Sequence, residues 1–348
     1  MSDRRSLLYV LTSGTVVLLL LAVVLGLNML VDPLWFFGGD KLAPRNFAFD
    51  ERTARAARFA SADKDYDCYI FGASRVSLMN ENRFVGHKCF MFSFAAATPR
   101  ELVAFAEYAK AFESREPRLV IVGIDDFDFI DQADSFDVPS FVADKKLPSF
   151  WDFYLSARVA TWSVKTLLDQ SPLERYYDAD LTGQVRATAR SFQAPRLTLP
   201  PGQHWHFSDT NVGVYAEFRR IFPNARLVAY VTPIASSRVL AYRHDGILPD
   251  YLRAIVDTAK HFDEAYDFSI PSAVTTNPAL TYDGSHFYPS VGDQIAAAIQ
   301  SHDGGFGVRI DGLTTNQLQA LYATRIEGLP SLGPAAFHKL VDTAQVHR

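Results

Sequence analysis

The sequence is poor in cysteine, in compact sets of metal ligands and in net charge. Only Cys68 and Cys89 occur among its 348 residues, too few for a disulfide framework or a cysteine-built zinc site. Each begins an apolar, strand-like run, so we favour two buried free thiols over a bridge. The formal net charge of −5 leaves no cationic footprint of the kind that binds nucleic acid. We therefore expect no metal, no cofactor and no nucleic-acid partner.

Long hydrophobic runs are also scarce, and the chain has one. Leu7 to Val31 is an apolar stretch of about 25 residues, enough to cross a bilayer with some tilt. A cleaved signal peptide has a shorter apolar region and a small-residue cleavage site, and the segment from Asn28 to Pro33 supplies a poor one. We interpret the run as an uncleaved transmembrane anchor in contact with membrane lipid.

The residues that flank this anchor predict its orientation. Arg4 and Arg5 precede it, which places the N-terminus in the cytoplasm. Trp35, Phe36 and Phe37 follow it and fit an aromatic belt at the far interface. We therefore expect a single-pass protein of a bacterial inner membrane, with the rest of the chain in the periplasm.

Beyond the anchor, short apolar strands alternate with helical segments. The strand candidates are Cys68–Phe71, Cys89–Phe94, Leu119–Ile124, Leu227–Val231 and Ala265–Phe268. The helix candidates are Ala54–Ala62, Pro99–Phe112, Phe150–Leu168, Arg253–Phe262, Val291–Ile299 and Thr314–Arg325. Such alternation predicts an α/β fold in which helices cover both faces of a central parallel sheet.

The alternation breaks between residues 131 and 212. An acidic, proline-marked loop is followed there by the aromatic helix Phe150–Leu168 and by the extended segment Pro195–Phe207. Insertions of this kind commonly form a lid or a partner surface over a site. We predict three parts: residues 1–37 as cytoplasmic tip and anchor, 38–302 as an α/β domain that carries this insertion, and 303–348 as a helical C-terminal extension.

Two separated stretches hold the residue types of a serine nucleophile and its base. Ser74 follows the first strand, and the carboxyl end of a parallel strand is where open α/β sheets place their sites. Asp283 and His286 lie three residues apart, just before a C-terminal helix. A serine hydroxyl becomes a good nucleophile when an imidazole takes its proton, and a carboxylate on the other ring nitrogen fixes the tautomer. We therefore predict Ser74 as nucleophile, His286 as general base and Asp283 as the residue that orients it.

This ordered set resembles the SGNH (GDSL-type) hydrolase superfamily, in which the serine closes the first strand and an Asp-x-x-His segment precedes the last helix. The match covers roughly residues 65 to 300. The resemblance implies an SGNH-like three-layer sandwich with a Ser-His-Asp triad. The single anchor, the sequence Gly-x-Ser-Arg and the segment Gly123-Ile124-Asp125 further resemble exported members that acylate polymers, such as D-alanyl transfer and alginate O-acetyltransferase proteins. Those members act beside a membrane-bound O-acyltransferase, which the resemblance implies as a partner here.

Two blocks depart from the superfamily pattern. Its oxyanion donors are usually a glycine after the second strand and an asparagine after the third; here Ala95, Ala96 and Ala97 occupy the first block and Asp125 stands at the second. An ionised aspartate cannot donate a hydrogen bond. Backbone N–H groups of Ser74 and of the alanine turn can replace these donors. Alternatively Asp125 is protonated, or its region, with Asp126, binds a cation or a substrate hydroxyl.

The remaining polar candidates keep two interpretations each. Arg75 either anchors an anionic group of the substrate, such as a uronate or phosphate, or forms a salt bridge with Asp125 or Asp126. We interpret the acidic run from Asp125 to Asp134 as a solvated strand-end loop with one or two residues near the site. His204 and His206 either contact a ligand or are plain loop residues, and we favour the second interpretation.

These observations together predict a membrane-anchored, periplasm-facing O-acyltransferase or acylesterase that acts on a cell-envelope polysaccharide. Aromatic residues of the insertion would line the glycan groove or contact a membrane partner. The alternative is a catalytically inactive scaffold, or a glycan-binding subunit, of a complex that modifies an envelope polymer.

Overall fold

The computed structural model describes residues 2–39, 41–42, 45–61, 65–130, 136–178, 182–189, 192 and 205–329. Its helices are α1 (Ser2–Val31), α2 (Glu51–Ser61), α3 (Pro99–Phe112), α4 (Ser140–Ala143), α5 (Phe150–Tyr154), α6 (Ala157–Leu167), α7 (Thr210–Val214), α8 (Glu217–Ile221), α9 (Ser236–His244), α10 (Leu248–Ala259), α11 (Pro289–Ser301) and α12 (Thr315–Glu327). Its strands are β1 (Arg45–Phe47), β2 (Cys68–Gly72), β3 (Cys89–Ser93), β4 (Leu119–Ile124), β5 (Arg175–Asp178), β6 (Gly183–Val185), β7 (Arg226–Val231), β8 (Glu264–Asp267) and β9 (Val308–Arg309).

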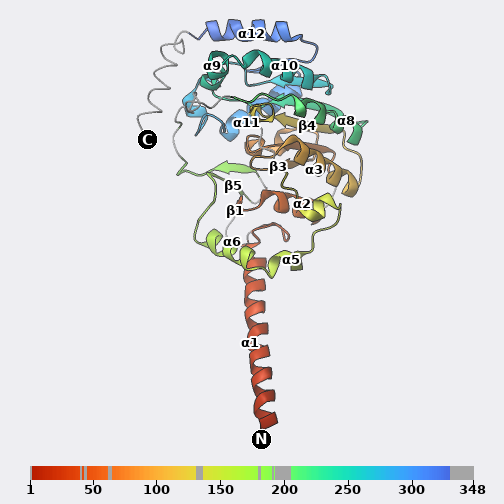
Figure 1. The fold of residues 1–348 in the computed structure, drawn as a ribbon, viewed down its shortest axis with the longest axis vertical. Helices are drawn as coiled ribbons and strands as arrows, with labels where there is room; N and C mark the ends of the chain where they lie inside the picture. Colours follow the sequence, from red (N-terminus) through yellow and green to blue (C-terminus); the bar gives the residue numbers. More distant parts are fainter. Residues whose placement is uncertain are drawn as a thin grey trace.

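A six-stranded sheet forms the centre of the body (Figure 1). Its strand order is β3-β2-β4-β7-β8-β9. The first five strands run parallel, and β9 pairs antiparallel with β8 at the edge. Strands β2, β3 and β4 are buried along their whole length, as expected of parallel strands covered on both faces. The prediction of an α/β fold with a mostly parallel central sheet is confirmed.

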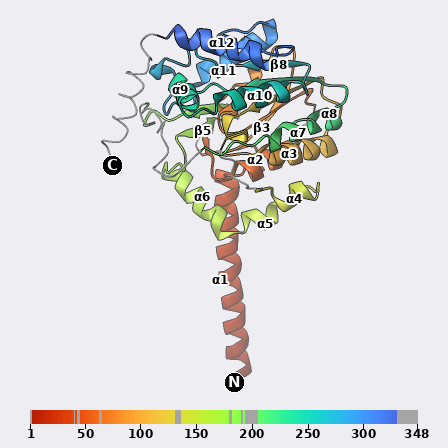
Figure 2. The same ribbon diagram turned by 45° about the horizontal axis from the view of Figure 1, so that its top comes forward.

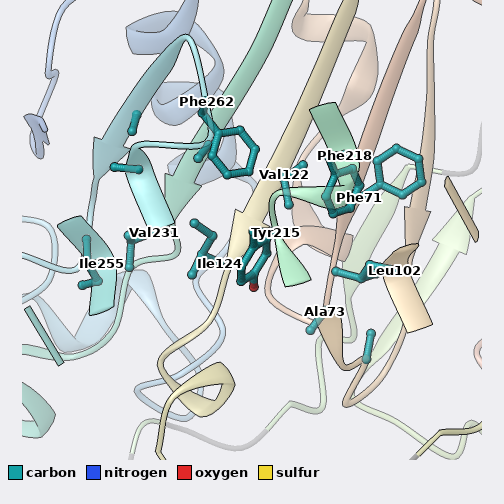
Figure 3. Close-up of a cluster of buried hydrophobic side chains, with 14 of the residues drawn as sticks. Phe71, Ala73, Leu102, Val122, Ile124, Tyr215, Phe218, Val231, Ile255 and Phe262 are labelled. Carbon is teal, nitrogen blue, oxygen red and sulfur yellow. The ribbon is translucent and has the colours of Figure 1, made fainter. Parts of the chain in front are cut away.

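Alternate residues of each strand enter two separate cores. One face, which includes Phe71, Val122 and Val231, packs against α3, α8, α10 and α12 and contributes to a large aromatic cluster (Figure 3). The other face, which includes Ile70 and Ile121, packs against α11 through Val291 and Ile295. The period of two along a strand assigns neighbouring residues to opposite faces, so a single apolar run supplies both cores.

Helix α12 belongs to the first of these cores. Its residues Leu318, Tyr322 and Ile326 are buried against the sheet domain, and Tyr322 Oη donates a hydrogen bond of 2.7 Å to Asp267 Oδ2. Strand β9 also pairs with β8. The described part of the segment 303–348 therefore packs on the sheet domain.

A second, smaller sheet lies at the end of the body from which α1 emerges. Strands β1, β5 and β6 pair antiparallel in the order β1-β5-β6. Helices α5 and α6 lie beside the base of α1, on opposite sides of it in both views (Figures 1 and 2). Within the described residues, one helix is long and apolar enough to cross a membrane, the segment Ser6–Val31 of α1.

Most predicted elements appear at the predicted places, and the aromatic helix of the insertion is the main exception. The expected helix Phe150–Leu168 is two helices, because the chain turns at Leu155 and Ser156. The Ser156 hydroxyl caps α6 by accepting a hydrogen bond from Val159 N–H. The expected loop before Pro148 also contains the short helix α4, while residues 131–135 lie outside the described chain.

The prediction of two free thiols is wrong, because Cys68 and Cys89 form a disulfide. The two cysteines are register partners on the neighbouring parallel strands β2 and β3, with their Cα atoms 4.2 Å apart. Side chains of register partners point to the same face of a sheet, so the two sulfur atoms meet. The strand-like runs were identified correctly, but their mutual register could not be read from either run alone.

The aromatic belt predicted at Trp35–Phe37 is also wrong. Trp35 is buried and packs edge-on against Tyr177, while Phe36 and Phe37 pack against Tyr154 of α5. Together with Leu34 and Val159 these residues form a third core, at the base of the body. The three aromatic side chains therefore join α1 to the rest of the protein.

Candidate active site

Ser74 lies on a sharp turn at the carboxyl end of β2. The turn leads directly into a 3-10 helix, η1 (Val76–Leu78), whose Val76 side chain packs across the ends of β2 and β4. A Cβ atom at Gly72 would lie 2.1 Å from Val76 Cγ2, and one at Gly123 would lie 2.3 Å from it. Glycine at both strand ends therefore permits the tight turn that carries Ser74.

His286 lies on a loop that Asp283 organises. Asp283 Oδ1 accepts hydrogen bonds from the backbone N–H groups of Ser285 (2.9 Å) and His286 (2.7 Å). Thr281 Oγ1 donates to the carbonyl oxygen of His286 at 2.7 Å, which closes the loop from the other side. Gly284 has φ +78°, a left-handed conformation that glycine adopts without strain. The loop therefore holds the imidazole in one orientation.

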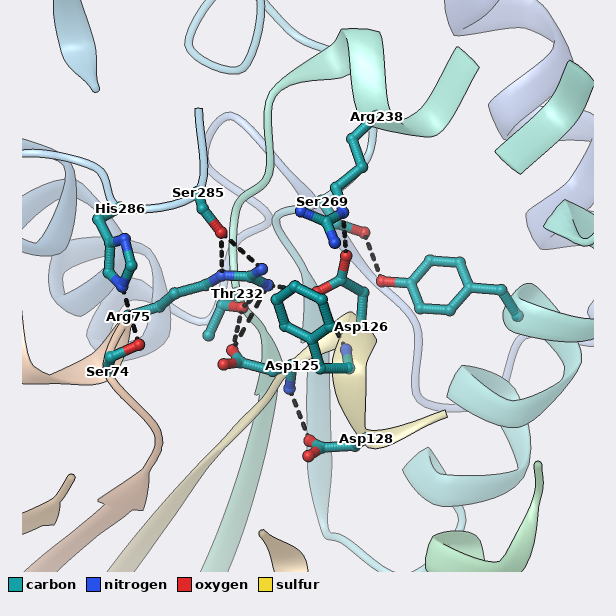
Figure 4. A network of polar contacts seen from close by, with 12 residues as sticks. Ser74, Arg75, Asp125, Asp126, Asp128, Thr232, Arg238, Ser269, Ser285 and His286 are labelled. Carbon is teal, nitrogen blue, oxygen red and sulfur yellow. Dashed lines mark hydrogen bonds and ion pairs between the residues drawn. The ribbon is translucent and has the colours of Figure 1, made fainter. Parts of the chain in front are cut away.

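The structure brings the three predicted residues into one hydrogen-bonded row. His286 Nε2 lies 2.8 Å from Ser74 Oγ, and His286 Nδ1 lies 2.7 Å from Asp283 Oδ2 (Figure 4 shows the Ser74–His286 contact). The Tyr282 ring stacks on the imidazole, with ring centroids 5.5 Å apart. These are the distances at which an imidazole can take a hydroxyl proton while a carboxylate stabilises the resulting imidazolium.

The environment of Asp283 favours its ionised form. Burial alone would raise the pKa of this carboxyl, but hydrogen bonds and charge from His286, with the two backbone N–H donors, outweigh burial and lower the pKa below its usual value. An ionised carboxylate beside Nδ1 leaves the proton on that nitrogen and the lone pair of Nε2 directed at Ser74. This is the tautomer that a general base requires.

Arg75 forms the salt bridge that the sequence offered as one of its two interpretations. Its Nη1 atom lies 2.6 Å from Asp126 Oδ1 and 3.7 Å from Asp125 Oδ1. The Nε and Nη2 groups donate to Ser285 Oγ at 3.0 and 2.7 Å (Figure 4). Because Ser285 precedes His286, Arg75 ties the base-bearing loop to the end of β4. These contacts favour a positioning role for Arg75 over an anchor for an anionic substrate.

Asp126 is the centre of a buried charge cluster, which we call the site cluster and define as Arg75, Asp126, Arg238 and Tyr242. Arg238 Nε lies 2.7 Å from Asp126 Oδ2, and Tyr242 Oη donates to the same oxygen at 2.5 Å. Burial would raise the pKa of Asp126, but the charges of Arg238 and Arg75 and the Tyr242 hydrogen bond overcome it and hold the pKa well below the usual range. Asp126 is therefore a structural anion.

Asp128 is a second buried carboxyl, and it lies at the edge of the pocket. Its Oδ2 atom accepts hydrogen bonds from Asp125 N–H (2.8 Å) and Tyr215 Oη (2.5 Å). Burial, followed by the charge of Asp125, raises the pKa of Asp128 to about 8 despite these two donors. The interpretation of the acidic run as a solvated loop is wrong for Asp125, Asp126 and Asp128, which are all buried. Arginine and hydroxyl partners from distant segments make that burial possible.

The predicted oxyanion donors divide into two groups. Ala95 N–H donates to Glu51 Oε2 at 2.6 Å, so this donor is occupied. Ala96, with φ +49°, lines the same pocket as Ser74 and His286. Asp125 Oδ1 accepts a hydrogen bond from Thr232 Oγ1 at 2.5 Å, which makes it an acceptor at the place where the superfamily has a donor. Ser74, Ala96 and Ala97 are the candidates that line the pocket.

The candidate active site opens into a pocket of about 310 Å³. Ser74, Arg75, Ala96, Asp125, Asp128, Asn211, Ser285 and His286 are among its lining residues. A second pocket has a volume of about 510 Å³, and Ala95 borders it whereas Ala96 borders the first pocket. Phe49, Phe153 and Trp162 contribute aromatic walls to the second pocket. Among the described residues of the insertion, α5 and α6 thus lie beside the second pocket, and only Asn211 lines the first.

The sequence analysis missed several neighbours of the site. Thr232, Arg238, Tyr242 and Asn211 come from the ends of other strands and helices, and their contact with the acidic run depends on the folded sheet. The weak signal for Thr232 is its place directly after strand β7, at the same edge of the sheet as Ser74. His206 is exposed, and His204 lies outside the described residues. In the described ranges no group of three or more His, Cys, Asp or Glu residues could hold a metal ion.

No protein-family profile, curated protein or solved structure matches this chain at a significant level. The geometry of the site is therefore the basis for any functional assignment.

Proposed function

We propose that the protein is a membrane-anchored SGNH-like serine acyltransferase or acylesterase that acts on a cell-envelope polysaccharide. The observation that carries the proposal is the contact of Ser74 with His286 across a sequence separation of 212 residues, together with the contact of His286 with Asp283. The order of the elements supports it further: the serine follows β2, and the Asp-x-x-His loop precedes α11.

The proposed reaction is a two-step acyl transfer. Ser74 Oγ attacks the carbonyl carbon of an acyl donor, and His286 Nε2 takes the hydroxyl proton. The bond from the carbonyl carbon to the leaving group breaks, and the imidazolium returns its proton to that group. The acyl-serine is then attacked by a sugar hydroxyl or by water, whose proton passes to His286 and on to Ser74. The N–H groups of Ser74 and Ala96 are the proposed donors to the developing oxyanion.

The disulfide supports the proposed location. Disulfides persist in oxidising compartments, of which the bacterial periplasm is one, and are rare in the cytosol. With α1 across the inner membrane and Arg4 and Arg5 on the cytoplasmic side, the Cys68–Cys89 bridge and the site would both face the periplasm. The polysaccharide acceptor and an acyl-delivering membrane-bound O-acyltransferase are the partners we propose for that side.

The inactive scaffold or glycan-binding subunit is the second candidate function, and two observations favour it. The Ala95 N–H is occupied by Glu51, and Asp125 presents a hydrogen-bond acceptor where an oxyanion would need a donor. Loss of one oxyanion donor typically lowers the rate by about 10²–10³-fold, which leaves an enzyme with a slower first step.

The test is formation of an acyl-serine in the full-length protein in detergent micelles. We expect incubation with p-nitrophenyl acetate to release p-nitrophenol and add one acetyl group, detected by intact mass. Ser74→Ala should abolish the adduct, a loss of at least about 10⁴-fold in rate. Ser77→Ala is the matched control, because Ser77 lies in the same turn but bonds to Ser93 Oγ. An adduct that survives Ser74→Ala, or none in folded wild type, would overturn the enzyme proposal.

A further inference from the structure

Helices α5 and α6 carry apolar side chains outward at the end of the body where α1 emerges. Trp151 of α5 is 54% exposed, and Leu168, at the end of α6, is 62% exposed. Leu147, Leu155, Val164 and Leu167 are also exposed on this segment. Figures 1 and 2 place both helices beside the base of α1. An apolar surface of this kind on a soluble domain marks a contact with a partner or a membrane.

Hydrogen bonds fix these helices at a definite height on α1. Asn28 of α1 donates from Nδ2 to the carbonyl oxygen of Tyr154 at 2.8 Å, and its Oδ1 accepts from Ser163 Oγ at 2.8 Å. The Tyr154 hydroxyl also donates to Asp32. Asn28 is fully buried between the two helices. Helices α5 and α6 therefore sit beside the last two turns of the apolar run.

The length of the uncovered part of α1 indicates how deep in a bilayer α5 and α6 would lie. From Leu7 to Val23 the helix is exposed on all sides, and from residue 24 onward the body begins to cover it. These 17 residues span about 26 Å, while the hydrocarbon core of a bilayer is about 30 Å thick. A helix of 17 residues is at the short end of the range that crosses a bilayer, so the covered turn lies at the membrane interface and brings α5 and α6 to the lipid surface.

The charges on α6 suit the same location. Arg158 and Lys165 are exposed on this helix, and Lys165 directly follows the exposed Val164. A helix with an apolar face flanked by basic residues lies in the plane of the membrane interface, where it meets both acyl chains and anionic headgroups.

We propose that α5 and α6, which we call the membrane platform, lie in the outer interface of the same bilayer that α1 crosses, in direct contact with lipid. The platform holds the body at a fixed height and tilt instead of leaving it on a free stalk. It also brings the second pocket, which Phe153 of α5 and Trp162 of α6 help to line, next to the membrane surface. That pocket borders the Ala95–Ala96 wall of the candidate active site, so a membrane-delivered donor would approach from this side.

This inference rests on the anchor of the proposed function, and the experiment separates the two. The native cysteines are joined in a disulfide, so one added cysteine can be labelled with an environment-sensitive fluorophore. Full-length Leu168→Cys is reconstituted into vesicles of phosphatidylcholine with a minor share of phosphatidylglycerol, containing lipids with a nitroxide near the head or the middle of the acyl chain. Val17→Cys reports on the anchor. Val85→Cys, 82% exposed on the body, is the matched control outside the membrane.

We expect the Leu168 label to lose emission mainly with the shallow nitroxide, the Val17 label mainly with the deep one, and the Val85 label with neither. Quenching at position 17 with none at position 168 would overturn the platform and leave the anchor in place. No quenching at either position would overturn both. A blue shift at position 168 without nitroxide quenching would mean that a second copy of the chain covers the helices, which also overturns the proposal.

Discussion

The protein contains two buried units with the same chemistry, each built from a carboxylate, arginine and tyrosine. In the site cluster, Asp126 binds Arg75, Arg238 and Tyr242. In the second unit, which we call the basal cluster, Glu51 binds Arg175 at 2.7 Å and accepts a hydrogen bond from Tyr177. Both units join segments that are far apart in the chain, and both sit in the protein interior.

The two units differ in what lies at their edge. Arg75 of the site cluster extends to Ser285, one residue from the candidate base. Glu51 of the basal cluster extends to Ala95 N–H, and so joins the small sheet, through Arg175, to the wall between the two pockets. One unit therefore positions a candidate catalytic loop, and the other joins the end of the body from which α1 emerges to the pocket wall. The residue types of such a cluster therefore do not reveal its role from the sequence.

The largest loss of stability that we expect comes from replacing the Asp126 carboxylate of the site cluster. Asp126→Asn leaves the buried Arg238 without its carboxylate and Arg75 with only Asp125, 3.7 Å away, and should lower the free energy of unfolding by about 3–5 kcal/mol. Glu51→Gln leaves one buried guanidinium group, Arg175, without its carboxylate and should cost less. Urea unfolding of both variants in micelles, followed by tryptophan fluorescence, tests this order. A Glu51→Gln loss equal to or larger than that of Asp126→Asn contradicts it.

A smaller effect should appear in the dependence of stability on pH. The Asp128 carboxyl has a pKa of about 8 in the folded protein and an ordinary pKa, near 3.9, when unfolded. Between these values the folded state binds the extra proton, so the stability contributed by this group is present at low pH and is lost as pH rises towards 8. We expect wild type to lose about 2 kcal/mol more than Asp128→Asn between pH 6 and pH 8. Parallel pH curves for the two proteins would refute the prediction.

The smallest effect that we expect is a change in acylation rate, and it distinguishes a residue that positions the catalytic loop from one that only stabilises the fold. Arg75→Lys keeps the charge beside Asp126 but loses the fork that holds Ser285, so acyl-adduct formation should slow by about tenfold. Arg175→Lys makes the same chemical change in the basal cluster and should lower stability without slowing acylation. Burst rates with p-nitrophenyl acetate, beside unfolding curves, provide both measurements. Equal slowing in the two variants would remove the distinction between the clusters.

The central sheet and the candidate triad could be predicted because their signals are local. A strand that ends in Gly72-Ala73-Ser74, and an Asp and His three residues apart before a helix, are visible in short windows of sequence. Alternation of apolar strands with helices then gives the layer order. The break at Ser156 had a readable signal as well, because serine is a preferred N-cap residue.

What could not be predicted depends on register and on distant partners. The Cys68–Cys89 bridge requires that β2 and β3 be neighbours in one exact alignment, and a slip of one residue would turn the sulfur atoms to opposite faces. Asp126 looks like a solvated residue until Arg238 and Tyr242, more than 100 positions later, are placed around it. The small sheet was not predicted for the same reason, since β1 and β5 are short and pair residues 45–47 with residues 176–178.

The long sequence separation between Ser74 and His286 also has a consequence in time. A ribosome adds about 5–20 residues per second, so roughly 10–40 seconds pass between synthesis of the serine and of its base. During that interval α1 and Ser74 have been synthesised, while the loop that carries His286 has not been made. If the proposed function holds, Ser74 would gain its base only after the last third of the protein has been synthesised and has folded against the first third.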